Sequence, residues 1–249
     1  MTRVSELRVQ LFADGADLAG IKEAARNPLI RGFTTNPTLM RAAGVNDYEA
    51  FARAVLDEIR DLPVSFEVFS DEFEEMADQA RLIASWAPNV VVKIPITNTR
   101  REPSYALLRR LADEGIRLNV TAMMTLDQVR AAAEAVASAS LAYISVFAGR
   151  IADTGRDPVP LMAEAVAILR PHTNIQLLWA SPRELLNVFQ ADAVGCHVIT
   201  ATADVLKKLS SVGKDLDEFS LETVKMFHND ADYAGYRLHT SRPRAISAE

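Results

Sequence analysis

The stretch Val90-Val91-Val92-Lys93-Ile94-Pro95-Ile96 has the composition of a buried strand and contains one lysine. Short runs of β-branched residues are typical of parallel strands that are covered on both faces. Burial disfavours the charged form of a lysine, and a neutral amine can attack a carbonyl group. The chain contains six lysines, and only Lys93 lies in a run of this kind. Two ordinary interpretations stay open here: Lys93 reaches solvent at the strand end, or it pairs with a carboxylate.

Composition narrows the class of protein. The chain has 249 residues, of which 49% are hydrophobic and 24% are charged, an ordinary balance for a globular protein. A formal net charge of −6 argues against general nucleic-acid binding, which requires a basic face. No apolar run approaches the length of a membrane span, and the first residues do not resemble a signal peptide. We therefore expect no membrane partner and a cytoplasmic location.

Neither disulfide nor metal chemistry is expected. Cys196 is the one cysteine of the chain, so it cannot form a disulfide within the chain or a cysteine cluster for a metal. The four histidines are scattered and lack the spacing of metal ligands. We expect no metal site and no cofactor.

Strand and helix patterns alternate along the whole chain. Eight segments are expected to form strands, and each is followed by a helical pattern. These strands are expected at 7–14, 29–34, 64–69, 89–96, 116–121, 141–147, 175–180 and 196–200. Strict alternation predicts a parallel sheet, and the lack of a Gly-x-Gly-x-x-Gly motif favours a closed barrel over an open sheet. The prediction is an α/β fold: a single (β/α)8 TIM barrel domain over residues 1–249, with its core at about 7–210 and an additional C-terminal helix and tail at 211–249.

Two stretches have the capping-box pattern that opens a helix, Thr125-Leu126-Asp127-Gln128 and Ser181-Pro182-Arg183-Glu184. A helix is expected to begin at each of them. Free backbone N–H groups at the start of the second helix would form an anion site beside Arg183. The stretch from Ala148 to Asp157 contains glycines and is expected to be a loop before the next helix.

Polar residues gather at the predicted carboxyl ends of the strands, where active sites of such barrels lie. They are Asp14, Thr34-Thr35-Asn36, Glu67, Lys93, Asn119 and Thr121, Ser145 with Arg150, and Ser181 with Arg183. Each can be interpreted by itself as an ordinary structural residue, such as a turn residue, a helix cap or a surface arginine. Together they place a lysine, two carboxylates, several hydroxyl and amide groups and two arginines on one rim of the barrel. Structural roles alone hardly explain such a combination.

These residue types fit the chemistry of an imine. An amine that forms an imine needs acid–base partners, which Asp14 and Glu67 can supply, with Thr121 to hold a water. Amide and hydroxyl groups suit the hydroxyls of a sugar-like substrate, and the arginines with Ser181 suit a phosphate. The valines and isoleucines around Lys93 are expected to keep the site dry. A sugar-phosphate-binding barrel without catalysis stays an alternative.

Six motifs in chain order resemble the transaldolase family over roughly residues 8–210. They are Leu11-Phe12-Ala13-Asp14-Gly15-Ala16-Asp17, Thr34-Thr35-Asn36-Pro37, Val92-Lys93-Ile94-Pro95, Asn119-Val120-Thr121, Ser145-Val146-Phe147-Ala148-Gly149-Arg150 and Ala180-Ser181-Pro182-Arg183. The order of the Thr-Thr-Asn-Pro and Lys-(Ile/Val)-Pro motifs is a specific signal.

The resemblance implies roles for these residues. Lys93 would form the Schiff base, Asp14 would be the acid/base for carbon–carbon cleavage, and Glu67 with Thr121 would position a water. Asn36, Asn119 and Ser145 would hold the dihydroxyacetone part, and Arg150, Ser181 and Arg183 would hold the phosphate. Thr35 and Phe147 would also bind substrate. The resemblance also implies sugar phosphates as partners, a homo-oligomer, and a place in carbohydrate metabolism such as the pentose phosphate pathway.

Within this family, fructose-6-phosphate aldolases release free dihydroxyacetone and stay an alternative to a transferase. They carry glutamine where this chain has Glu67, and tyrosine where it has Phe147, so both positions look like transaldolase. Three residues depart from the usual pattern: Val146 replaces proline, Ala148 replaces valine, and Pro182 replaces phenylalanine. The departures lie beside Arg150 and between Ser181 and Arg183, so they bear on phosphate recognition and leave the chemistry at Lys93 unaffected.

Overall fold

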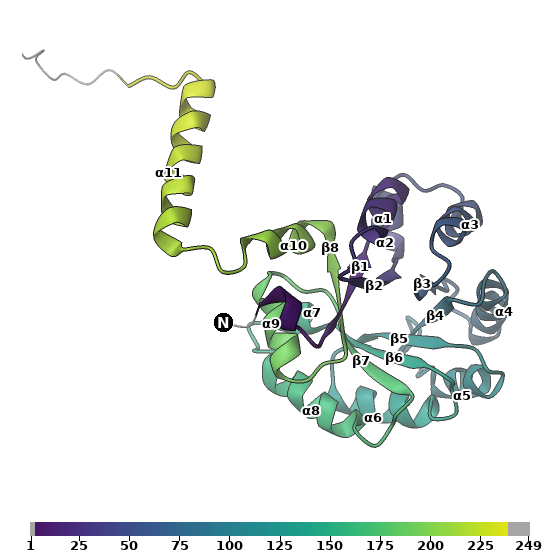
Figure 1. The fold of residues 1–249 in the computed structure, drawn as a ribbon. Helices are drawn as coiled ribbons and strands as arrows, with labels where there is room; N and C mark the ends of the chain where they lie inside the picture. Colours follow the sequence, from purple (N-terminus) through teal and green to yellow (C-terminus); the bar gives the residue numbers. More distant parts are fainter. Residues whose placement is uncertain (1–2, 239–249) are drawn as a thin grey trace, which may run out of the picture. The chain divides into compact units, whose positions relative to one another are not determined.

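Eight parallel strands close into a barrel in chain order in this computed structural model, which describes residues 3–238 (Figure 1). The strands are β1 (Gln10–Asp14), β2 (Ile30–Thr34), β3 (Val64–Glu67), β4 (Val90–Pro95), β5 (Leu118–Met123), β6 (Ala142–Val146), β7 (Ile175–Trp179) and β8 (Val198–Thr202). The pairing of β1 with β8 completes the ring. The predicted (β/α)8 barrel is confirmed, although most strands are a few residues shorter than expected.

Helices follow each strand and lie outside the ring (Figure 1). The helices of the described residues are η1 (Val4–Glu6), which precedes β1, then α1 (Leu18–Ala25), α2 (Pro37–Ala42), α3 (Tyr48–Glu58), α4 (Phe73–Ala84), α5 (Tyr105–Asp113), α6 (Leu126–Ala135), α7 (Ala148–Ala152), α8 (Val159–Leu169), α9 (Leu186–Ala193), α10 (Ala203–Lys207), η2 (Lys208–Ser211) and, in the second unit, α11 (Leu216–Tyr233). None of the helices in the described part of the chain is long and apolar enough to cross a membrane.

Local sequence explains where several helices begin. Asp17, Asn36, Asp47 and Thr125 cap α1, α2, α3 and α6 with side-chain oxygens that accept backbone N–H groups. The capping box at Thr125 is complete, because Gln128 also bonds back to the cap, as predicted.

Two local predictions are wrong. The stretch from Ala148 to Asp157 is not all loop, because Ala148–Ala152 form α7. No helix begins at Ser181, because Ser181 has a left-handed backbone with φ of 60° and α9 starts only at Leu186. The backbone N–H groups of Arg183 and Glu184 are occupied by the Asn187 side chain, so the anion site expected at a helix start there is wrong too.

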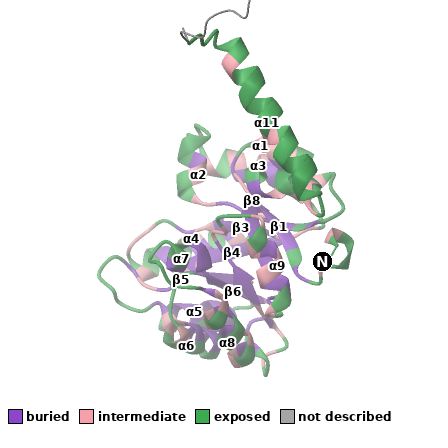
Figure 2. Cartoon of the chain, turned by 90° about the vertical axis from the view of Figure 1, so that its left-hand side faces the viewer, coloured by how far each residue is buried: buried purple, intermediate pink, exposed green. Residues whose placement is uncertain are grey.

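Apolar side chains form two clusters on the two sides of the strands. The larger cluster lies between strands and helices, and the smaller one consists of Phe12, Val91, Tyr143, Leu178, Ala180 and Val198. Figure 2 shows the strands buried, while the outward faces of the helices are exposed. Because successive side chains of a strand point to opposite faces, the smaller cluster fills the barrel interior.

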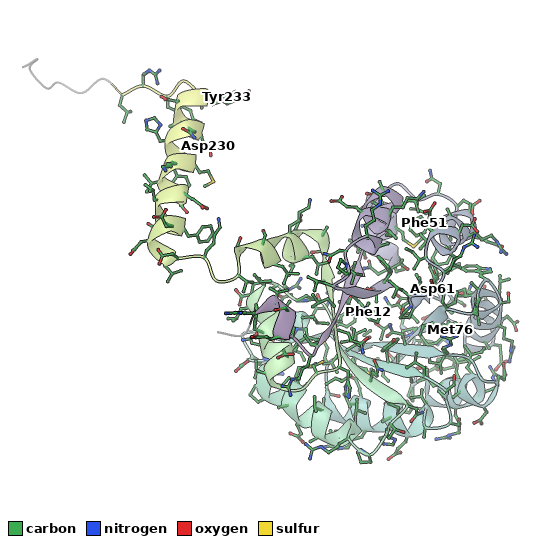
Figure 3. All side chains as sticks on the ribbon, viewed as in Figure 1. Phe12, Phe51, Asp61, Met76, Asp230 and Tyr233 are labelled. Atoms are coloured by element: carbon green, nitrogen blue, oxygen red, sulfur yellow. The ribbon has the colours of Figure 1, made fainter. Side chains whose placement is uncertain are left out.

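Phe12, which Figure 3 labels, belongs to this interior cluster. It is fully buried and meets Tyr143 edge to face, with ring centroids 5.6 Å apart. The neighbouring strand makes room through Gly32, because a Cβ there would lie 2.5 Å from the Phe12 ring. Phe12 and Gly32 therefore form a matched pair that closes the barrel below its carboxyl end.

The strand around Lys93 is buried on both faces, as predicted. Val92 and Ile94 belong to the outer cluster, whereas Val91 belongs to the interior one. The expectation that all the neighbouring valines and isoleucines keep the site dry is therefore corrected. Val92 and Ile94 hold β4 against the helices, and Val91 with the interior cluster lies under the site.

The described chain divides into two compact units. The barrel unit ends at Ser210, and the second unit contains α11. The predicted helix after the barrel is present as α11, Leu216–Tyr233. Residues 239–249 of the expected tail lie outside the described part of the structure. That one domain spans residues 1–249 stays a prediction.

Candidate active site

A cavity of about 370 Å³ opens at the carboxyl ends of the strands. All the predicted site residues except Thr35 line it: Asp14, Asn36, Glu67, Lys93, Asn119, Thr121, Ser145, Phe147, Arg150, Ser181 and Arg183. They come from β1 and from β3 to β6, and from the segments that follow β2, β6 and β7. The period-2 alternation of strands brings them together, because every second residue of each strand points inward.

Lys93 lies near the centre of this set. Its side chain is 8% exposed, and its Nζ lies 3.0 Å from Glu67 Oε2 on the neighbouring strand β3. The ammonium also donates to the carbonyl oxygen of Thr35 at 2.8 Å. Of the two ordinary interpretations, pairing with a carboxylate is present and snorkelling to solvent is not. The pairing leaves the lysine facing a cavity, so it is compatible with chemistry at Nζ.

Thr35 serves the site through its backbone. It is buried, its hydroxyl donates to the carbonyl of Ser65 at 3.0 Å, and its own carbonyl accepts from Lys93. The geometry therefore does not support the expected contact of its side chain with substrate.

Asp14 stands at the end of β1 and faces the same cavity. Its Oδ1 accepts from Thr34 Oγ1 at 2.8 Å, and its Oδ2 accepts from Asn36 Nδ2 at 3.4 Å. Burial raises the pKa of Asp14 above its ordinary value, while Lys93 and the two hydrogen bonds partly offset this effect. A raised pKa brings a carboxyl group closer to the range in which it can both take and return a proton.

Asn36 has two tasks. Its Oδ1 accepts the backbone N–H of Leu39 and so caps α2, as its interpretation as a helix cap predicted, while its Nδ2 reaches Asp14. The cap fixes the side chain over the cavity and does not prevent a contact with substrate.

Asn119 and Ser145 belong to a chain of buried side chains. The Ser145 hydroxyl donates to Asn119 Oδ1 at 2.6 Å, and Asn119 Nδ2 donates to Ser65 Oγ at 3.1 Å. Both residues also line the cavity. Their mutual bonds fix the amide so that it presents one orientation to a ligand.

Thr121 has a buried hydroxyl without a hydrogen-bond partner among the described residues. It lines the cavity together with Lys93 and Glu67. An orphaned buried hydroxyl in a polar cavity is suited to bind a water or a substrate hydroxyl. The next residue, Ala122, has a left-handed φ of 65° and also lines the cavity.

Two arginines line the outer part of the cavity. Arg150 lies over the ring of Phe147, with Cζ 6.0 Å from the ring centroid. Arg183 forms a two-bond ion pair with Asp153, in which Nε donates to Oδ1 at 3.0 Å and Nη2 donates to Oδ2. Because a guanidinium has five N–H donors, this pair leaves Arg183 able to bind an anion on another edge.

Gly149 allows the segments that carry these arginines to approach each other. A Cβ at Gly149 would lie 1.5 Å from the carbonyl oxygen of Ser181, which no side chain can accommodate. The N–H of Gly149 donates to the carbonyl of Ala180 at 3.4 Å. The close contact between α7 and the segment after β7 therefore depends on glycine.

Four residues outside the predicted set of site residues support the site: Thr34, Tyr48, Ser65 and Thr200. Thr34 was noted only as a strand-end residue, and its hydroxyl contacts both Asp14 and Thr200. Tyr48 donates from α3 to the carbonyl of Glu67 at 2.7 Å, and burial raises its pKa above the usual range. Period-2 alternation along β3 and β8 could have pointed to Ser65 and Thr200, but no local signal links Tyr48 to Glu67.

No group of three or more His, Cys, Asp or Glu residues within residues 3–238 is arranged to hold a metal ion. The site is instead built from one amine, two carboxylates, amides, hydroxyls and guanidinium groups. Lys93 beside Glu67, with Asp14 in the same cavity, favours chemistry that begins at a carbonyl group and uses proton transfer.

Comparisons with known proteins identify a family to which this barrel and its site residues are similar. The family model described as Transaldolase/Fructose-6-phosphate aldolase matches residues 11–238. A Dehalococcoides mccartyi protein named "Probable transaldolase" is 34% identical over 202 residues, which cover 81% of this chain and 90% of that protein. A Listeria monocytogenes protein named "Probable transaldolase 2" is 35% identical over 204 residues, which cover 82% of this chain and 89% of that protein.

A solved structure of dihydrodipicolinate synthase from Rhodopseudomonas palustris matches with a TM-score of 0.55 at 15% identity, covering 86% of this chain and 79% of that one. At this identity the likeness indicates a shared barrel fold alone. The family match covers nearly the whole barrel and every residue of the site. The chain belongs to the transaldolase/fructose-6-phosphate aldolase family.

Proposed function

We propose that the protein is a transaldolase that transfers a dihydroxyacetone unit from a ketose phosphate to an aldose phosphate. The observation that carries the proposal is Lys93, whose buried Nζ faces the cavity and contacts Glu67, with Asp14 lining the same cavity. A lysine next to two carboxylates fits imine chemistry, whereas binding of a sugar phosphate alone would need neither carboxylate.

The steps follow from these groups. Lys93 loses a proton, its amine adds to the ketose carbonyl, and loss of water gives an imine. Glu67 and the free hydroxyl of Thr121 hold the water that leaves and later returns. Asp14 takes the proton of the hydroxyl next to the bond that breaks, and an aldose phosphate departs. The electron pair of the broken bond forms an enamine on Lys93.

In the second half of the reaction, the same steps occur in reverse with the acceptor aldehyde. The enamine carbon attacks the aldehyde of the acceptor, and Asp14 returns its proton to the new alkoxide. Water then hydrolyses the imine and frees Lys93. Asn36, Asn119 and Ser145 are the proposed contacts of the dihydroxyacetone hydroxyls, and Phe147 forms an apolar wall. Arg150, Arg183 and Ser181 are the proposed phosphate contacts.

Borohydride trapping tests the covalent step. Reduction in the presence of fructose 6-phosphate is expected to attach a three-carbon adduct to Lys93, located by peptide mass spectrometry. A matched Lys93→Met variant should remain unlabelled. An unmodified Lys93 in the wild-type protein would contradict the mechanism.

Glu67 and Phe147 favour transfer over release of free dihydroxyacetone, because fructose-6-phosphate aldolases carry glutamine and tyrosine at these positions. Adding erythrose 4-phosphate as acceptor separates the two activities. A transferase consumes its donor faster with acceptor present, whereas a lyase releases dihydroxyacetone at the same rate without it. An acceptor-independent rate would assign the lyase.

Phosphorylated sugars carry charge and do not cross membranes unaided, so their enzymes must act where they are made. We therefore propose that the protein acts in the cytoplasm, in carbohydrate metabolism of the pentose phosphate type.

We also propose a homo-oligomer. Within the second unit, α11 has no buried residue and exposes the apolar side chains Leu216, Phe219, Leu221, Val224, Met226 and Phe227. Exposed apolar groups at this density are typical of an interface, and a second copy is the usual partner. Light scattering should give a multiple of the chain mass, and Phe219→Asp with Phe227→Asp should lower it. A monomeric wild-type protein would contradict the proposal.

A further inference from the structure

A threonine on β8 is joined to the candidate acid/base. Thr200 is 5% exposed, and its Oγ1 lies 2.6 Å from Oγ1 of Thr34. Thr34 in turn donates to Asp14 Oδ1 at 2.8 Å. The three residues lie on adjacent strands, because β1 pairs with both β2 and β8. A line of hydrogen bonds therefore crosses three strands and ends on the carboxylate.

The number of hydroxyl protons fixes which residue donates in each hydrogen bond of this chain. A threonine hydroxyl has one proton to donate. Thr34 gives its proton to Asp14, so the bond between the two hydroxyls must be donated by Thr200. Each donor in such a chain polarises the next one and strengthens the last bond, here the one to the carboxylate.

We infer that Thr200 is a positioning residue that acts on Asp14 through Thr34, holding the Thr34 hydroxyl as a donor to the carboxylate. This inference rests on the proposed role of Asp14 as the acid/base. Neither threonine needs to touch the substrate for this role, since the effect on Asp14 is transmitted through the two hydrogen bonds.

The direction of the chain depends on the protonation state of Asp14. When Asp14 has taken the substrate proton, its O–H can donate to Thr34, and Thr34 can then donate to Thr200. Both hydroxyls only rotate, and the proton stays on Asp14 until the acceptor takes it. With an ionised Asp14 both hydroxyl protons have an acceptor, whereas with a protonated Asp14 the Thr200 proton has none among these three side chains, so the chain favours the carboxylate.

The charges that face Asp14 fix the sign of the expected effect. Lys93 on β4 lowers the pKa of Asp14 and Glu67 on β3 raises it, while the hydrogen bonds from Thr34 and Asn36 lower it against the effect of burial. Loss of the Thr34 bond, or of its support by Thr200, should therefore raise the pKa of Asp14 further.

A carboxyl titration tests this without depending on turnover. Aspartate carboxyl carbons labelled with ¹³C are titrated by NMR, and the Asp14 signal is assigned as the one lost in Asp14→Asn. Thr200→Val should move the Asp14 midpoint up by about half a pH unit, the size expected for one weakened hydrogen bond. Thr200→Ser should restore it, and Thr34→Val should shift it at least as far.

A double mutant separates action through Thr34 from a general effect. In the Thr34→Val background, Thr200→Val should add little or no further shift. Thr202→Val, on the same strand and in the same cavity wall, should leave the midpoint unchanged, because the hydrogen bonds of Asp14 run to Thr34 and Asn36. Thermal melts confirm that each variant is folded.

An unchanged midpoint in Thr200→Val, an equal shift in the Thr34→Val background, or no recovery in Thr200→Ser would each overturn the inference. Failure of the proposed function gives a different result, in which wild-type Lys93 stays unlabelled by borohydride. In enzyme that does turn over, the acidic limb of kcat/KM for donor cleavage should move with the NMR midpoint.

Discussion

The Nζ atom of Lys93 lies 3.0 Å from Oε2 of Glu67, across the neighbouring strands β4 and β3. The same ammonium donates to the carbonyl of Thr35, and the backbone of Glu67 is held by the hydroxyl of Tyr48. Both partners are therefore held by hydrogen bonds to groups outside the pair. An anchored pair can exchange a proton without first rearranging, which an imine-forming lysine requires before it attacks.

Removal of the Glu67 charge should slow imine formation. Glu67→Gln keeps the size of the side chain but loses the proton acceptor beside Lys93, so donor consumption should fall about 10²-fold or more. Single-turnover borohydride trapping measures the rate at which Lys93 is labelled. Glu72→Gln is the matched control, since Glu72 is exposed and pairs with Arg100 instead. An unchanged labelling rate in Glu67→Gln would show that another group takes the proton.

Asp14 should make the stability of the protein depend on pH. Burial raises its pKa in the folded state above the ordinary value of 3.8, so the folded protein holds this proton more tightly than the unfolded chain. Stability from this group is therefore present at low pH and is lost as the pH rises through the folded pKa. Asp14→Asn removes the group, so the Tm of the variant relative to wild type should increase as the pH rises above the ordinary pKa of 3.8.

Calorimetry of the wild-type protein and of Asp14→Asn at several pH values tests whether the difference in Tm increases with pH. A constant offset between the two Tm values would mean only that the amide changed local hydrogen bonding. A relative Tm that decreases with pH would contradict a raised pKa.

The matched pair Phe12 and Gly32 should be sensitive to one added methyl group. Gly32→Ala places a Cβ 2.5 Å from the Phe12 ring, so the free energy of unfolding should fall by about 1–3 kcal/mol. Gly15→Ala is the control, because a Cβ there meets nothing within 4 Å. Urea unfolding measures both. Phe12→Leu in the Gly32→Ala background should recover part of the loss, and full additivity would contradict direct contact.

Arg183 should distinguish phosphorylated from unphosphorylated donors. Arg183→Lys loses the planar fork, so KM for fructose 6-phosphate should rise about 10-fold, while KM for free dihydroxyacetone as donor should hardly change. Arg156→Lys, an exposed arginine on the loop after α7, serves as control. Steady-state kinetics with both donors tests this, and an equal rise for the two would place Arg183 away from the phosphate.

Much of the site could be predicted because it follows from regular structure. Once eight strands are counted, the inward side chains near their ends must meet, and Asp14, Glu67, Lys93 and Asn119 do so. Lys93 was recognisable because a β-branched run of this kind is buried, and a buried lysine must be paired or neutral.

The errors arose where long-range packing overrides a local pattern. Ser181 has the sequence of a helix cap, yet its backbone is held in a left-handed turn against Gly149, which is 32 positions earlier in the chain by residue number. Tyr48 and Thr200 were missed for a related reason. Their partners, Glu67 and Thr34, become neighbours only in the closed barrel.

The buried Phe12 ring and its neighbours fill the barrel interior, and the cavity that Lys93 lines lies at the carboxyl ends of the strands. Donor, first product and acceptor must then share one mouth. The departing aldose has to leave before the acceptor can enter, while the three-carbon fragment waits on Lys93. For the proposed transferase, this filled interior imposes an order of events: double-reciprocal plots at several acceptor concentrations should be parallel lines.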